Sequence, residues 1–134
     1  MTGLESLIAF CLNDAPDFHT RLILDDVLAG KLDISEHLPY GELNECDDAT
    51  RVLYGMALDI KFHGHALVWV HSGGDRVQVF NLPTALCSAS PPTPEYPYGY
   101  WRVSNGEQWK AVDARDVTRV DRVDFDRVLK ELSL

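Results

Sequence analysis

Basic side chains, cysteines and long apolar runs are all scarce in this sequence of 134 residues. Twelve Lys and Arg stand against 21 Asp and Glu, which gives a formal net charge of −9. So few cations leave no footprint for direct binding to nucleic acid, because binding to phosphates requires positive charge. No apolar run approaches the roughly 18 residues of a membrane span. The first ten residues lack the basic region and cleavage site of a signal peptide, so we expect a cytoplasmic protein without membrane contacts.

The cysteine pattern argues against a disulfide framework and against a cysteine metal site. Cys11, Cys46 and Cys87 are odd in number, widely spaced and free of any CxxC pair. This usage is typical of free thiols in a reducing cytosol. We expect Cys11 to lie in the core, and carboxylates around Cys46 should make it a poor nucleophile. The sequence therefore predicts inert cysteines.

Acidic residues, by contrast, are concentrated in one segment. Residues 14–48 hold ten carboxylates against only Arg21 and Lys31, so this stretch carries −8 of the total −9. Such a segment is suited to docking on a basic surface, with long-range attraction guiding the encounter. A solvated acidic face that only keeps the protein soluble is the simpler alternative.

Length and periodicity predict one α+β domain, with N-terminal helices packed on a small antiparallel sheet of two hairpins and a short C-terminal helix. We divide it into an acidic helical half, 1–62, and a β half with the C-terminal helix, 63–134. The last helix follows from the spacing of Phe125, Val128, Leu129 and Leu132. Residues 116–123 are predicted as a further strand.

Three helices are predicted in the first half. Thr2 and Glu5 have the spacing of a capping box before a helix over 3–12. Asp14 is expected to cap a second helix that stops at Gly30, and its wide apolar arc suggests burial on more than one side: Phe18, Leu22, Ile23, Leu24, Val27 and Leu28. A third helix, capped by Asp47 or Asp48, has an unbroken apolar stripe: Ala49, Val52, Leu53, Met56, Ala57 and Ile60. Gly55 lies opposite that stripe, where either another backbone approaches or nothing selects against glycine.

Two hairpins are predicted in the second half. The first joins 66–71 to 76–80, with Val68 opposite Val79 and Val70 opposite Val77. The second joins 98–104 to 107–112 across Asn105-Gly106. In that register Trp101 faces Lys110 and Arg102 faces Trp109.

A proline-rich stretch separates the hairpins. Pro91-Pro92-Thr93-Pro94 has PxxP spacing, so it is either a polyproline II ligand or, as we favour, a stiff connector. Residues 94–106 contain PEY, GYW and SNG, and this stretch of 13 residues is similar to a motif in plasmid antirestriction proteins, with a different loop spacing. No residue role is transferred from that similarity.

Histidine and aromatic clusters offer two further candidate sites. His63 and His65 have the His-x-His spacing of some metal sites, but the sequence indicates no third ligand, and His71 is about 26 Å away along a strand. The second hairpin gathers rings that either pack internally or form a second binding surface: Tyr98, Tyr100, Trp101 and Trp109.

No phosphate-binding loop, nucleophile elbow or HExxH motif is present, so we expect no catalytic residues and no cofactor. The leading hypothesis is a non-enzymatic acidic inhibitor of a basic protein, such as a nuclease or a CRISPR effector subunit, of the kind used by phages and mobile elements. Its expected partner-binding residues are Asp25, Asp26, Asp33, Glu36, Glu42, Glu45, Asp47 and Asp48. The alternatives are a small metal protein or enzyme centred on His63 and His65, and an immunity or chaperone-like partner of one cognate protein.

Overall fold

The computed structural model describes residues 2–14, 16–33, 48–73, 76–104 and 108–134. Its helices are α1 (Gly3–Leu12), α2 (Phe18–Leu28), α3 (Ala49–His63) and α4 (Arg122–Glu131). Its strands are β1 (His65–Gly73), β2 (Arg76–Leu82), β3 (Cys87–Ser90), β4 (Tyr100–Ser104), β5 (Trp109–Asp113) and β6 (Val117–Asp121). Two short 3-10 turns, η2 (Thr84–Leu86) and η3 (Ala114–Asp116), precede β3 and β6. The α+β class is confirmed.

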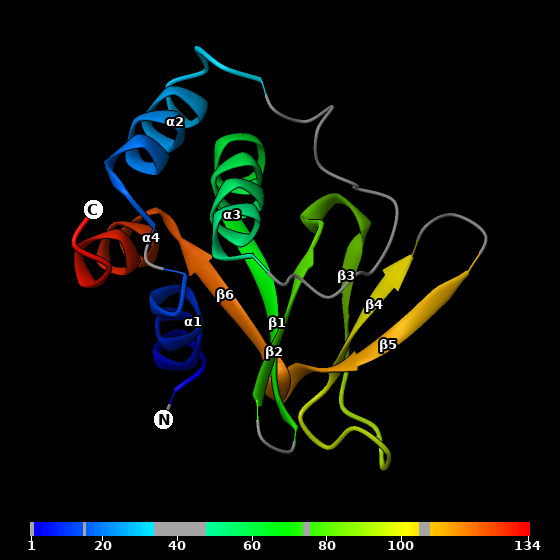
Figure 1. The fold of residues 1–134 in the computed structure, drawn as a ribbon. Coiled ribbons are helices and arrows are strands. Elements are labelled where there is room, and N and C mark those ends of the chain that lie inside the picture. The colour runs from blue at the N-terminus through cyan, green and yellow to red at the C-terminus, as the bar shows by residue number, and fades with distance from the viewer. Residues whose placement is uncertain (1, 15, 34–47, 74–75, 105–107) are drawn as a thin grey trace.

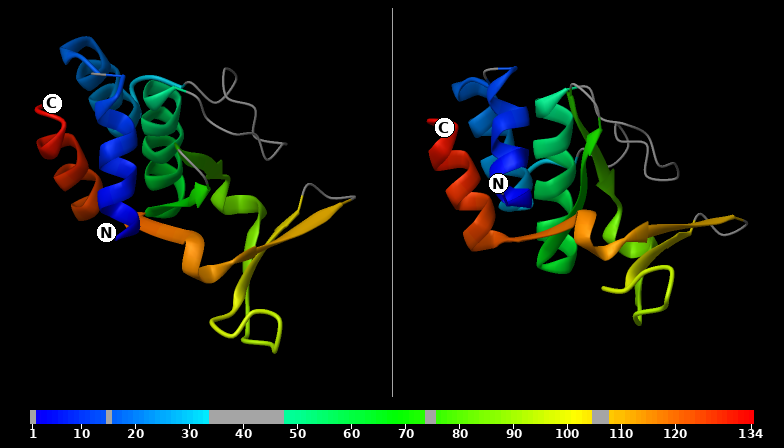
Figure 2. Two further views of the ribbon diagram at one scale, coloured as in Figure 1. Left: turned by 60° about the horizontal axis from the view of Figure 1, so that its bottom comes forward. Right: turned by 90° about the horizontal axis from the view of Figure 1, so that it is seen from below.

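The strands form two antiparallel sheets, whereas the sequence predicted one sheet of two hairpins. The first sheet has the order β2-β1-β6 and the second has the order β3-β4-β5. Figure 1 shows the second sheet extending away from the helices, which gather on the other side of the first sheet (Figures 1 and 2). The prediction missed β3 because this strand of four residues ends directly before Pro91, where proline-rich sequence favours a loop. The strand predicted over 116–123 is β6, which pairs with β1.

Both predicted hairpin registers are wrong by two residues. In the first hairpin Val79 pairs with Val70 instead of Val68, and the ladder continues to Gly73 and Arg76. In the second hairpin Arg102 pairs with Ala111 and Ser104 pairs with Trp109. A shift of two residues keeps every side chain on its predicted face, because side chains alternate with a period of two. The faces were therefore predicted correctly although the partners were not.

The core lies between α3 and the first sheet. All six residues of the predicted α3 stripe are buried, and Phe125, Val128 and Leu129 of α4 are buried as well. Asp48 caps α3 by accepting a hydrogen bond from the backbone N–H of Thr50 at 2.8 Å. Asp14 does not cap α2 as predicted, since its carboxylate accepts a hydrogen bond from Ala49 N at 2.7 Å and so stabilises the start of α3.

The cap of α2 is Asp17, whose carboxylate accepts a hydrogen bond from Thr20 N at 3.1 Å. This bond to the backbone lowers the pKa of Asp17. Pro16 therefore precedes the helix. After α2, Gly30 adopts a positive φ of 75°, which confirms it as the stop signal.

Gly55 is buried against a side chain, which neither sequence interpretation anticipated. A Cβ at this position would overlap the side-chain amide of Asn81 on β2. The Oδ1 atom of Asn81 is itself buried without a hydrogen-bond partner among the described residues. The glycine therefore lets α3 pack closely over β2. Among the described residues, no helix has the length and apolar character needed to cross a membrane.

Candidate partner-binding surfaces

Helix α2 turns an unusual mixture of side chains toward solvent. Its inner face buries Leu24 and Val27 in the core. On its outer face Phe18 is 71% exposed and Leu22 is 48% exposed. The prediction that the wide apolar arc is buried on more than one side is therefore wrong, because the described structure leaves the outer part of that arc uncovered.

Two of the predicted acidic residues lie beside these exposed apolar side chains. Asp25 and Asp26 are exposed, and the spacing of positions 18, 22, 25 and 26 places all four residues on one side of the helix. Asp25 forms an ion pair with Arg21, with Nε and Oδ1 3.0 Å apart. Its side chain remains 49% exposed, so water screens this pair and the carboxylate can still interact with a partner. We call Phe18, Leu22, Asp25 and Asp26 the α2 surface.

The remaining predicted acidic residues do not extend the α2 surface in the described structure. Asp33 is exposed beyond the end of α2, and Asp48 is occupied in capping α3. Four others lie outside the described residues: Glu36, Glu42, Glu45 and Asp47. Cys46 lies outside them too. Burial raises the pKa of Cys11 and of Cys87 to about 12, so both thiols are protonated at neutral pH.

The predicted aromatic surface is divided between the two faces of the second sheet. Side chains alternate between the two faces of a strand, so Tyr100 and Trp109 share one face of the second sheet with the paired residues Arg102 and Ala111. We call this the outer face. Trp101 lies on the opposite face, where its pairing partner Val112 is buried. The ammonium of Lys110 on that same inner face lies 4.9 Å from the ring centroid of Trp69 in β1. This contact links the two sheets.

The outer face carries an open pocket of about 620 Å³. Its walls combine two aromatic residues of the sheet, Tyr100 and Trp109, with the loop residues Thr93, Pro94, Glu95 and Tyr96. Ala111 lies next to Trp109 on this face of β5, and its small methyl group leaves room beside the indole ring. We call this the aromatic pocket. Thr93 and Pro94 belong to the stretch that the sequence predicted as a stiff connector, and they instead line this pocket.

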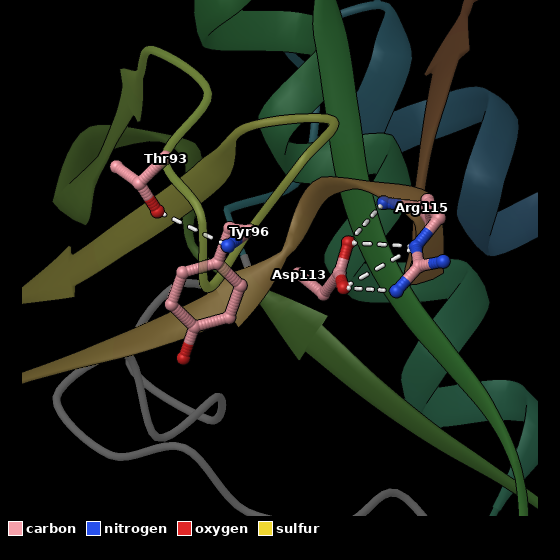
Figure 3. Close-up of polar contacts among 4 residues, drawn as sticks. All are labelled: Thr93, Tyr96, Asp113 and Arg115. Atoms are coloured by element: carbon pink, nitrogen blue, oxygen red, sulfur yellow. Dashed lines mark hydrogen bonds and ion pairs between the residues drawn. The ribbon is translucent and has the colours of Figure 1, made fainter.

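Local hydrogen bonds hold the loop that forms one wall of the aromatic pocket. Thr93 Oγ1 accepts a hydrogen bond from Tyr96 N at 3.0 Å, as Figure 3 shows. Thr93 N also donates to Tyr96 O at 3.0 Å. Gly99 has a φ of 88°, and a Cβ there would come within 2.9 Å of the Ser90 carbonyl oxygen. The return of the chain into β4 therefore requires glycine.

An ion pair and a cation–π contact of Arg115 hold the far end of the same loop. Arg115 donates to Asp113, with Nη2 and Oδ2 2.9 Å apart, as Figure 3 shows. The guanidinium also lies 5.0 Å from the ring centroid of Tyr98. Hydrogen bonds from the Arg115 side chain hold the pKa of Asp113 below its usual value. Tyr98 thus contacts Arg115 and does not line the aromatic pocket.

The two histidines of the metal hypothesis flank a turn. His63 ends α3, His65 begins β1, and Gly64 between them has a φ of 80°. Within the ranges that the structure describes, no group of three or more His, Cys, Asp or Glu side chains is arranged to hold a metal ion. The metal hypothesis therefore has no third ligand in this part of the chain.

Asp59 is a buried carboxyl that sequence analysis missed because it stands inside the apolar run of α3. It is 5% exposed, and Thr84 N donates to its Oδ2 at 3.4 Å. Burial raises the pKa of Asp59 to about 6, although that hydrogen bond and the charge of His63 act in the opposite direction. The neighbouring thiol of Cys87 donates to the carbonyl of Pro83, with Sγ and O 3.2 Å apart. A protonated thiol engaged in this way is not an activated nucleophile.

Comparisons with protein families, with curated proteins and with solved structures give no match. Function must therefore be argued from the chemistry of the two surfaces. The α2 surface combines apolar anchors with negative charge, and the aromatic pocket combines rings with one carboxylate.

Proposed function

We propose that this protein is a non-enzymatic, acidic inhibitor that binds the basic, nucleic-acid-binding surface of another protein. The observation that carries the proposal is the α2 surface, where Phe18 and Leu22 are exposed next to Asp25 and Asp26. A nuclease or a CRISPR effector subunit is the target class, since such proteins present clustered Arg and Lys to bind phosphates. The proposed setting is the cytosol of a bacterial host, where a phage or mobile element uses the inhibitor as a counter-defence protein.

The two kinds of side chain on the α2 surface supply different parts of the binding. The carboxylates, together with a net charge of −9, attract a cationic surface and raise the rate of association. The apolar side chains supply contact area that becomes buried in the complex, and large apolar side chains of this kind act as interface anchors. Phe18 is 71% exposed, and an exposed phenylalanine does not increase solubility, so a purely solubilising role does not account for this face.

The test is a capture experiment from host lysate at low and high salt, with bound proteins identified by mass spectrometry. The first variant removes charge from the α2 surface by Asp25→Asn and Asp26→Asn. The matched control, Asp126→Asn with Glu131→Gln, removes the same charge from the exposed side of α4. Asp126 is a close match for Asp25, because it also pairs with an arginine four residues away, Arg122. A third variant, Phe18→Ser, removes the most exposed anchor.

We expect the wild type and the α4 control to capture the same nucleic-acid-handling protein at low salt. Capture should weaken with salt and with the charge variant, and it should be lost with Phe18→Ser. A partner that both α2 variants retain as well as the wild type would contradict the assignment of the α2 surface. A captured partner with no role in nucleic-acid binding would contradict the proposed class of target.

A further inference from the structure

We propose that the aromatic pocket binds the guanidinium of an arginine side chain presented by another protein. This site is separate from the α2 surface, since α2 and the second sheet lie on opposite sides of the molecule (Figures 1 and 2). The inference therefore goes beyond the proposed inhibitor function and is tested independently of it. An open pocket of about 620 Å³ is within the range of small-ligand sites, so it has room for an arginine side chain.

The walls of the pocket have the composition that favours a cation. Tyr96 and Tyr100 form a tilted pair with ring centroids 5.1 Å apart, and Trp109 supplies a third ring. The faces of such rings carry negative electrostatic potential, so they attract ammonium and guanidinium groups. Within the described ranges no cation of the chain itself lies over Tyr96 or Tyr100. These two rings are therefore available to a ligand.

Glu95 adds a full negative charge at the same pocket. It is exposed, and no described Lys, Arg or His forms an ion pair with it. A carboxylate next to aromatic rings complements a guanidinium, which can stack on a ring and donate two parallel hydrogen bonds to the carboxylate. A lysine ammonium is not planar, so it cannot stack on a ring and donate two parallel hydrogen bonds to the carboxylate. Arginine is therefore the better match.

The second sheet already holds one guanidinium over an aromatic ring. Arg102 lies 4.4 Å from the ring centroid of Trp109 on the outer face. This contact shows that an indole on this face accepts a planar cation. It also covers part of the Trp109 ring and places a positive charge near the pocket. Arg102 therefore competes with an incoming arginine, so replacing Arg102 by an uncharged residue should strengthen binding of the ligand.

Hydrogen bonds hold the backbone of the loop wall in place without a ligand, which lowers the entropy lost on binding. The two hydrogen bonds between Thr93 and Tyr96 hold the turn that carries Glu95. Gly99 N donates to Tyr96 O at 2.9 Å, and Ala114 N donates to Gly99 O at 3.1 Å, so the loop is joined to β5 and η3. Because no large rearrangement is needed, a short peptide suffices as a probe.

The experiment is an NMR titration of the full chain with acetyl-Gly-Arg-Gly-amide, following the indole N–H of Trp109 and the tyrosine ring signals. The matched probe replaces arginine by citrulline, which has nearly the same shape without the charge. We expect saturable shifts with the arginine peptide and binding about tenfold weaker with citrulline. Glu95→Gln should raise the Kd about threefold, and Arg102→Gln should lower it about twofold. Glu131→Gln, which removes a distant exposed carboxylate, should leave the Kd unchanged.

Each other outcome overturns the proposal. Equal shifts with the arginine and citrulline peptides show that charge is not recognised. Tighter binding in Glu95→Gln with weaker binding in Arg102→Gln shows that the pocket takes an anion. Saturation at lower concentration by a Pro-Pro-Thr-Pro peptide assigns the pocket to proline-rich ligands. No shift with any probe, in a protein whose spectrum shows that it is folded, shows that the pocket takes no such ligand. None of these results bears on the α2 surface, so partner capture by that surface stands or fails separately.

Discussion

Replacing Asp59 by Asn should stabilise the protein at neutral pH and leave it nearly unchanged in acid. The carboxyl is 5% exposed, and burial raises its pKa from the ordinary value of 3.8 to about 6. Ionisation of this buried carboxyl at pH 7.5 therefore lowers the free energy of unfolding by about 3 kcal/mol. Asparagine has almost the same shape, carries no charge, and its amide oxygen can still accept the hydrogen bond from Thr84 N.

The sign follows from proton binding. Between about pH 4 and pH 6 the folded protein holds a proton on Asp59 that the unfolded chain has released, so this carboxyl lowers the stability as the pH rises through that window. Above about pH 6 the penalty is complete. The charge of His63 acts on this carboxyl in the opposite direction to burial, and His63 is retained in the variant.

The assay is urea unfolding of the wild type and Asp59→Asn at pH 4.5, 6 and 7.5. The difference between the two proteins should grow from about 1 kcal/mol at pH 4.5 to about 3 kcal/mol at pH 7.5. Taking this difference cancels the groups that titrate equally in both proteins. The control, Asp26→Asn, makes the same chemical change on the exposed side of α2, where there is no burial penalty to relieve. A difference that is independent of pH, or a variant less stable than the wild type at pH 7.5, would refute the reasoning.

Three further predictions concern the packing of the fold, and urea unfolding measures each of them. Gly55→Ala should cost about 1–3 kcal/mol, because the new methyl group meets the Asn81 amide, and adding Asn81→Ala should recover part of the loss; an unchanged midpoint would mean that the contact is absent. Gly64→Ala should cost about 1 kcal/mol from its positive φ alone, since no atom lies within 4 Å of the added carbon, and Gly64→Asn should cost less; equal losses would argue against backbone strain as the cause. Phe125→Ala should cost about 3–5 kcal/mol because the ring is fully buried, and a loss below about 1 kcal/mol would show that α4 is not part of the core.

Local patterns predicted the elements of this fold more successfully than their pairing. The apolar stripe of α3 and the Thr2 cap of α1 depend on neighbouring residues, and both are confirmed. The hairpin registers failed because the sequence signal marks a turn without fixing which residues close the ladder. The pairing of β6 with β1 joins residues about 50 positions apart, so no local pattern could reveal it.

The two candidate surfaces also depend on contacts between distant residues, which a local sequence pattern does not give. The sequence identified Asp25 and Asp26 as acidic, but it predicted burial for Phe18 and Leu22 because an apolar arc looks the same whether or not another element covers it. The aromatic pocket depends on the return of a loop across β4 and β5, which the positive φ of Gly99 permits. A prediction from sequence could name the rings and could not assign them to a face.

If the protein inhibits its target as proposed, it competes with nucleic acid for one surface of that target. The direct measurement is a titration of the captured partner, bound to a fluorescently labelled nucleic acid, with the wild type and with the Asp25→Asn, Asp26→Asn variant. We predict that the wild type releases the nucleic acid and that the variant needs about tenfold more protein to do so. A ternary complex that retains the labelled nucleic acid at saturating inhibitor would contradict the claim.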